Sequence, residues 1–148
     1  MSAVSVGQEA PDFTLRDENN QQISLSALRG TPVVLVFYPA SFSPVCTREM
    51  CAIRDDFTEF EQKGARVFGV SRDGVWTQRA FKEKENLQHS LLADTKGDVA
   101  RLYGAWNEVA GVAERLTVVI DREGVVQYVE HAGWTDVRDP HLAAAAIK

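Results

Sequence analysis

Long apolar runs alternate with amphipathic segments along most of this chain. Residues 33–37 (VVLVF) form an unbroken run of β-branched and aromatic side chains, which is typical of a strand buried on both faces of a sheet. Residues 67–70 repeat the pattern. Between them, apolar residues at helical spacing predict one helix over 44–63, with Gly64 as its terminator. The same reasoning predicts short strands at 13–15, 23–25, 91–92, 116–120 and 125–129, and helices at 26–29, 75–87, 99–103 and 139–147.

The order of these elements predicts an α/β fold. Strands alternate with helices through the middle of the chain, and turn-forming residues predict hairpins at 13–25 and at 116–129. We therefore expect a mixed central sheet flanked by helices, with an N-terminal hairpin. The chain has 148 residues, of which 45% are hydrophobic and 25% charged, and this composition fits a single domain over 1–148.

Charge and hydropathy argue against two classes of partner. The net charge is −5, from 21 acidic and 16 basic residues scattered along the chain, so we expect no nucleic acid partner. The longest apolar stretch, 33–40, is too short to cross a bilayer, and the N-terminal segment MSAVSVGQEAPDF has neither a basic leader nor an apolar core. We therefore expect a cytoplasmic protein with no membrane partner.

Two cysteines, Cys46 and Cys51, are the candidate reactive groups. In a cytosolic protein they seldom form a structural disulfide, so catalysis, metal binding and simple burial remain as explanations. Cys46 follows a buried strand and a short loop, close to the predicted helix start. Unpaired backbone N–H groups and the helix dipole at such a position favour the thiolate, which is the nucleophilic form. Ionisation contributes only about 2 kcal/mol of the roughly 8 kcal/mol or more that enzymes supply, so another group must polarise the substrate.

The segment PASFSPVC, residues 39–46, resembles the active-site signature of the peroxiredoxins: proline, three residues, threonine or serine, two residues, cysteine. The segments APDFTL near the start, VVLVFYP before the signature and ERLTVVID at 114–121 extend the resemblance over most of the chain. The resemblance implies a thioredoxin-like fold. It also implies a thiol-dependent peroxidase that reduces hydrogen peroxide and organic hydroperoxides.

The resemblance assigns roles to single residues. It implies that Cys46 is the peroxidatic cysteine, that Pro39 shields it from water and that the Ser43 hydroxyl orients the peroxide. It also implies that Arg115 lies against the sulfur, where a guanidinium stabilises the thiolate and the charge that develops as the O–O bond breaks. Ser43 stands where threonine is commoner, so it keeps the hydroxyl but loses the methyl group that restricts the rotamer.

Two more residues are expected around this site. Glu49 fits the pattern of the subfamilies that the chain approaches, where it holds the arginine, and its alternative is a solvated carboxylate on a helix. Phe42 lies inside the signature and is expected to make the peroxide pocket apolar, although such aromatic residues more often belong to a core or an interface.

Cys51 lies five residues after Cys46, an arrangement similar to that of the Q-type peroxiredoxins, also called bacterioferritin comigratory proteins. The resemblance implies that Cys51 resolves the Cys46 sulfenic acid as an intramolecular disulfide, which thioredoxin or another dithiol then reduces. Five residues along a helix separate Cα atoms by roughly 8 to 9 Å, whereas a disulfide needs less than about 7 Å. The helix must therefore unwind locally for the bond to form.

Other interpretations stay open. Residues 103–108 and 110–115 look more like the E-type peroxiredoxins of actinobacteria, in which a single cysteine suffices and an external thiol or mycoredoxin resolves it. A thiol-disulfide oxidoreductase usually has two residues between its cysteines, whereas four intervene here. A metal-binding or other non-enzymatic interaction domain is disfavoured because His89, His131 and His141 have no familiar zinc-ligand spacing. We expect no cofactor, no metal, and a monomer or homodimer.

Overall fold

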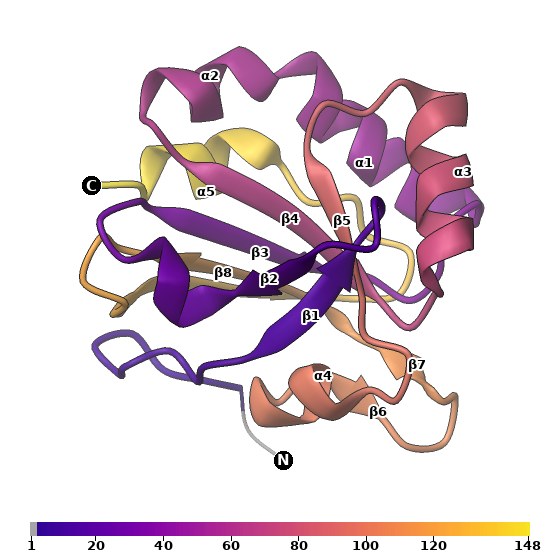
Figure 1. Ribbon diagram of the computed structural model, residues 1–148, viewed down its shortest axis with the longest axis horizontal. Coiled ribbons are helices and arrows are strands. Elements are labelled where there is room, and N and C mark those ends of the chain that lie inside the picture. Colours follow the sequence, from indigo (N-terminus) through magenta and orange to yellow (C-terminus); the bar gives the residue numbers. More distant parts are fainter. Residues whose placement is uncertain (1–2) are drawn as a thin grey trace.

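A computed structural model describes residues 3–148, which form a mixed sheet with helices on both faces (Figure 1). The order of the strands is β2–β1–β5–β4–β3–β8–β9. The central strands β3, β4 and β5 are parallel, whereas β8, β9 and the β1–β2 hairpin are antiparallel to their neighbours. The strands are β1 (Thr14–Asp17), β2 (Gln22–Ser24), β3 (Val33–Phe37), β4 (Arg66–Ser71), β5 (Ser90–Ala93), β8 (Arg115–Ile120) and β9 (Val126–Ala132).

Four helices pack on one face of the sheet and one on the other (Figure 1). The first group is α1 (Pro44–Asp55), α2 (Phe57–Gln62), α3 (Val75–Glu85) and α5 (Pro140–Ala145). The opposite face carries α4 (Asp98–Leu102), next to a small sheet of β6 (Trp106–Asn107) and β7 (Val112–Ala113). A 3-10 turn, Leu25–Leu28, follows β2.

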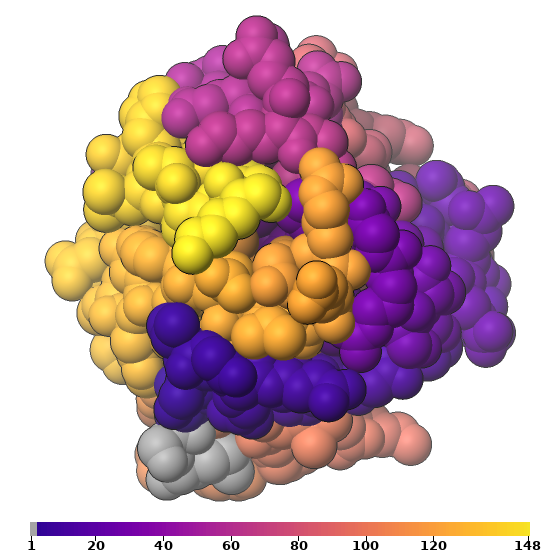
Figure 2. Space-filling model, turned by 90° about the vertical axis from the view of Figure 1, so that its left-hand side faces the viewer, coloured from indigo at the N-terminus to yellow at the C-terminus, as the bar shows by residue number. Residues whose placement is uncertain are grey.

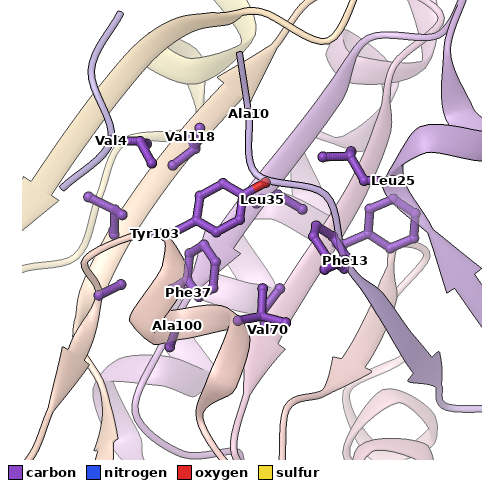
Figure 3. Close-up of a cluster of buried hydrophobic side chains, with 14 of the residues drawn as sticks. Val4, Ala10, Phe13, Leu25, Leu35, Phe37, Val70, Ala100, Tyr103 and Val118 are labelled. Carbon is purple, nitrogen blue, oxygen red and sulfur yellow. The ribbon is translucent and has the colours of Figure 1, made fainter. Parts of the chain in front are cut away.

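The central strand β3 contributes to two hydrophobic cores. Leu35 and Phe37 face α4, where the ring of Tyr103 lies 5.4 Å from that of Phe37 (Figure 3). Val34 and Val36 face α1, α2 and α5 on the other side. Successive side chains of a strand point to opposite faces, so both faces here must be apolar. This requirement explains the unbroken run at 33–37 in the sequence.

The C-terminal helix closes the face that carries α1. Figure 2 shows α5 in yellow between α2 in magenta and the orange segment that includes the β8–β9 turn. Lys63 donates from Nζ to the carbonyl oxygen of Ala144 at 2.6 Å, and His141 Nδ1 lies 2.5 Å from Glu59 Oε2. Among residues 3–148, no helix is long and apolar enough to cross a membrane.

The mixed sheet, the N-terminal hairpin and the closing β8–β9 hairpin are confirmed. The single helix predicted over 44–63 is wrong, because the chain breaks it at Asp56 into α1 and α2. Aspartate has a low helix propensity, and Asp56 has a φ of −106° and a ψ of 16°, outside the helical range. Its carboxylate lies 3.5 Å from His141 Nε2 of α5. The strands β6 and β7 have only two residues each, too few to give a hydrophobic pattern.

Candidate active site

Cys46 is the third residue of α1, and its side chain is completely buried. Strand β3 ends at Phe37, and residues 38–43 lead from it into the helix. Ser43 is the N-cap and Pro44 the first helical residue, a position where the missing N–H of proline costs nothing. The first turn has backbone N–H groups without helical partners, and their partial positive charge favours an anionic sulfur.

A buried polar network holds the loop between β3 and α1. The Tyr38 hydroxyl lies 2.9 Å from Ser41 Oγ and donates to Gln78 Oε1 at 3.1 Å. Ser41 donates from its backbone to Asp73 at 2.7 Å, and Gln78 donates from Nε2 to Ser71 Oγ at 3.0 Å. Burial raises the pKa of Tyr38, which therefore stays a neutral hydroxyl. The loop is thus anchored to β4 and α3.

Three signature residues lie within this loop. Pro39 is buried next to Tyr38, and Ser43 donates its hydroxyl to the carbonyl oxygen of Ala40 at 2.9 Å. Phe42 has a φ of 71°, a left-handed conformation that costs a bulky residue about 1 to 3 kcal/mol. Its ring is 46% exposed and packs on Phe81 of α3, at 5.1 Å between centroids.

Arg115 brings a guanidinium to the Cys46 sulfur. Arg115 is the first residue of β8, and the next residue, Leu116, pairs with Phe37 at the end of β3. The side chain therefore lies where β3 leads into the helix. Each guanidinium nitrogen has a partner: Nη2 donates to Cys46 Sγ at 3.3 Å, Nε donates to the carbonyl oxygen of Trp134 at 2.9 Å, and Nη1 donates to Glu49.

Glu49 lies one turn after Cys46 on α1 and is 2% exposed, so it is the buried partner of Arg115. A second arginine, Arg138 from the loop before α5, donates to its carboxylate from Nε at 2.6 Å, from Nη2 at 2.9 Å and from the backbone at 2.8 Å. Burial by itself raises the pKa of Glu49. The hydrogen bonds and charge of Arg138, with the charge of Arg115, outweigh burial and keep the pKa below its usual value.

The buried cluster of Arg115, Arg138 and Glu49 has unbalanced charge. Two guanidinium groups and one carboxylate leave one positive charge in excess, and all three residues are at most 7% exposed. A buried charge without a counterion is costly. Arg115 Nη2 donates to Cys46 Sγ, so a negative charge on this sulfur would balance the cluster.

Cys51 lies in the same helix as Cys46, and both cysteines are free. Cys51 is half-buried, and its sulfur donates to Glu85 Oε1 of α3 at 3.4 Å. Because the segment between the two cysteines is α-helical, the structure does not bring them together. Five residues of helix keep their Cα atoms roughly 8 to 9 Å apart.

Several residues that shape the site could not be predicted from the sequence. Arg138 and Trp134 lie in an irregular segment after β9 and carry no motif. Gln78 is completely buried although it belongs to an amphipathic helix, where glutamine usually faces water. Only its position on the apolar side of α3, three residues before Phe81, could have revealed it. Within residues 3–148, no cluster of three or more histidine, cysteine or acidic side chains could hold a metal ion.

The fold and the site together define a class: a thioredoxin-like protein with a buried cysteine at a helix N-terminus beside an arginine. The AhpC/TSA family matches residues 6–129, and the chain belongs to this family. This match, together with relatives named peroxiredoxin Q, confirms the resemblance to peroxiredoxins, and a solved peroxidoxin structure of similar fold confirms the thioredoxin-like fold.

Relatives and solved structures agree with this family. The chain is 42% identical over 127 residues to "Peroxiredoxin Q, chloroplastic" of Oryza sativa subsp. japonica, covering 85% of this chain and 58% of that protein. The chain thus spans less than two thirds of that relative's length. Peroxidoxin BcpB from Mycobacterium tuberculosis has a crystal structure with 34% identity and a TM-score of 0.87, covering 95% of this chain and 94% of that one. The reduced 2-Cys peroxiredoxin of Plasmodium vivax has 28% identity and a TM-score of 0.87, covering 94% of this chain and 78% of that one.

Proposed function

We propose that this chain is a thiol-dependent peroxidase that reduces hydrogen peroxide and organic hydroperoxides through Cys46. The observation that carries the proposal is the 3.3 Å contact of Arg115 Nη2 with Cys46 Sγ, inside a buried cluster with an excess positive charge. Such a cluster favours a thiolate, and it presents hydrogen-bond donors to an oxygen that gains negative charge. Membership of the AhpC/TSA family, and relatives named peroxiredoxin Q, support the same activity.

The first chemical step is attack by the Cys46 thiolate on one peroxide oxygen. An S–O bond forms as the O–O bond breaks, so the sulfur is oxidised to a sulfenic acid and the peroxide is reduced to water or an alcohol. The departing oxygen carries the negative charge until it takes up a proton. The Arg115 guanidinium is held by Glu49 and the Trp134 carbonyl, so it stabilises that charge without reorganising.

Access to the sulfur requires a local movement. Cys46 is completely buried in the described conformation, so a peroxide reaches it only when the segment 38–43 or a neighbouring side chain shifts. In the proposed mechanism Pro39 keeps the reacting sulfur dry, and the Ser43 hydroxyl turns from Ala40 to the peroxide. Phe42 lies partly exposed at the rim, where its ring adds apolar surface.

The second step assigns Cys51 as the resolving cysteine. The Cys51 sulfur attacks the Cys46 sulfenic acid, an S–S bond forms, and the thiol hydrogen leaves with the sulfenic hydroxyl as water. An external dithiol of the thioredoxin type then reduces the disulfide by exchange. Because both cysteines lie in one α-helix, this step requires α1 to unwind, and the helix refolds after reduction.

Peroxide turnover coupled to a thioredoxin system tests the proposal. The wild-type protein is expected to consume hydrogen peroxide catalytically, and Cys46→Ser is expected to abolish this activity. Mass spectrometry of the oxidised protein should find a disulfide between Cys46 and Cys51. Turnover that persists in Cys46→Ser would refute the proposed function. If Cys46 is found in a disulfide only with an external thiol, that thiol and not Cys51 is the resolving group.

A further inference from the structure

The end of α3 is attached to α1 at the second cysteine. Cys51 donates from Sγ to Glu85 Oε1 at 3.4 Å, and Glu85 is the last residue of α3. Arg54, almost one turn after Cys51, donates from Nη1 to the backbone oxygen of Glu85 at 2.6 Å. Two contacts therefore join α1 to a single residue of α3, and only one of them uses the Glu85 side chain.

The contact between Cys51 and Glu85 is compatible with a thiol but not with a thiolate. A thiol supplies the hydrogen that the carboxylate accepts, whereas a thiolate at the same distance would repel it. Burial raises the pKa of Cys51, the hydrogen bond with Glu85 raises it further, and the charge of Asp55 acts in the same direction. The positive charge of Arg54 opposes them and is outweighed.

This contact cannot survive the second step of the proposed cycle. To reach Cys46, the Cys51 sulfur must leave its place in the helix, since five helical residues separate the two Cα atoms by roughly 8 to 9 Å. Unwinding α1 therefore breaks the contact between the Cys51 sulfur and the Glu85 carboxylate, and in the same event the sulfur becomes free to move. The position and the nucleophilicity of Cys51 change in one event.

We propose that Glu85 is a positioning residue that keeps Cys51 as a protonated hydrogen-bond donor while α1 is helical and releases it when the helix opens. The proposal rests on the proposed role of Cys51 as the resolving cysteine. It makes Cys51 a weak nucleophile during peroxide attack and a stronger one only when the Cys46 sulfenic acid is within reach. It also gives the helical state of α1 a stabilising contact that the open state lacks.

The first test isolates the thiol of Cys51 and involves no peroxide. In a Cys46→Ser background, the rate of alkylation of Cys51 by iodoacetamide is measured against pH, with and without Glu85→Gln. Gln keeps an acceptor of the same size but removes the charge. We expect alkylation near neutral pH to become about fivefold faster, which corresponds to one unit charge about 4 Å away in water, and the rate–pH curve to move to lower pH.

Glu83→Gln is the matched control, because Glu83 is an exposed acidic residue two positions earlier on α3. It should leave the alkylation curve unchanged. A Glu85→Gln curve that coincides with that of the parent would overturn the proposal. A purely structural contribution of Glu85 would not move the pH at which the curve rises.

The second test follows disulfide formation in protein with both cysteines. Glu85→Ala removes the side-chain contact but keeps the backbone oxygen that Arg54 binds. After one equivalent of peroxide, we expect the disulfide to form roughly twofold to tenfold faster, the factor that one net hydrogen bond represents. If disulfide formation in Glu85→Ala is as fast as in wild type, the proposal that Glu85 holds Cys51 until the helix opens is overturned. Full turnover by Cys51→Ser would instead refute the resolving role of Cys51. The alkylation test would still show, independently of that role, whether Glu85 lowers the reactivity of the Cys51 thiol.

Discussion

Arg115 is oriented before any peroxide arrives. Its three guanidinium nitrogens contact a carbonyl oxygen, a carboxylate and the reactive sulfur, so the planar group is fixed by partners from the loop after β9 and from α1. A planar guanidinium can satisfy such divergent partners, whereas an ammonium is a single point charge. The orientation of Arg115, and not only its charge, should therefore matter for the reaction.

Replacing Arg115 by lysine tests this distinction. Arg115→Lys keeps the charge but loses the fork of donors, so we expect the second-order rate with hydrogen peroxide to fall by roughly 10²-fold, as for removal of one oriented donor. Glu49 keeps Arg138 as a partner, so the fold should persist. Stopped-flow measurement on the reduced protein gives the rate, and circular dichroism verifies the fold. A rate equal to that of wild type would remove Arg115 from the site.

Arg138 makes a prediction about stability. Arg138→Met leaves the buried Glu49 with one partner fewer, and breaking such a pair should lower the free energy of unfolding by about 3 kcal/mol. Arg29→Met is the matched control, because Arg29 pairs with Glu9 at an exposed position and should cost less than about 1 kcal/mol. Urea denaturation measures both. Equal losses in the two variants would contradict the assigned importance of the buried cluster.

Site residues that share a local sequence motif can be predicted from the sequence, whereas residues that come together only in the folded structure cannot. Pro39, Ser43 and Cys46 are close in sequence, and together they form the signature on which the resemblance to the peroxiredoxins rests. Arg115 was expected only through the family resemblance. Arg138 approaches Glu49 across 89 positions of the chain, and no local pattern encodes that contact.

At the scale of elements, the proposed cycle gives α1 two tasks that conflict. Its first turn holds the Cys46 sulfur beside Arg115, and in that cycle the rest of the same helix opens for Cys51 to reach the sulfur. Met50 and Ile53 are buried against the sheet, so opening α1 exposes apolar surface. In the proposed cycle the closed state is therefore favoured until the sulfenic acid has formed and the disulfide can offset this loss.

Cys51→Ser separates the two tasks. We expect this variant to reduce one equivalent of peroxide at the wild-type rate, because the site around Cys46 is intact. Turnover with thioredoxin should stop, and Cys46 should be oxidised further to the sulfinic acid more readily. Single-turnover kinetics and mass spectrometry measure these outcomes. Sustained turnover in Cys51→Ser would show that an external thiol resolves Cys46, as in the single-cysteine alternative.

The prediction of elements from the sequence succeeded where burial is continuous and failed where it is local. The run at 33–37 predicts a strand buried on both faces, and the structure confirms it. The break at Asp56 was missed because apolar residues keep their helical spacing on both sides of it. The small β6–β7 sheet depends on packing against α4, since the Trp106 side chain covers Gly97 at the start of that helix.

At the scale of the whole molecule, His89 links stability to pH. It is 2% exposed, and its Nε2 lies 3.3 Å from the Met50 sulfur, between β5 and α1. Burial, together with the nearby charge of Lys82, lowers the pKa of His89 to about 3, whereas an unfolded histidine has a pKa of about 6.5. Below about pH 6.5 the unfolded chain therefore binds a proton that the folded protein does not bind.

Because of His89, the free energy of unfolding should fall as the solution becomes more acidic. The contribution of His89 favours folding above about pH 6.5 and is lost progressively as the pH falls towards 3, by about 2 kcal/mol between about pH 7 and pH 5. Urea denaturation at the two pH values measures the loss. His89→Leu should reduce this loss by about that amount. The same pH dependence in His89→Leu as in wild type would contradict the assignment.

The second-order rate constant of the reduced protein with hydrogen peroxide, compared with that of free cysteine at the same pH, measures most directly whether this site activates Cys46. The buried cluster with its excess positive charge, and the oriented Arg115 beside the sulfur, should make Cys46 react at least about 10²-fold faster, since one oriented donor contributes about that factor. Stopped-flow fluorescence gives this rate constant. A value equal to that of free cysteine would contradict the claim that this site activates Cys46.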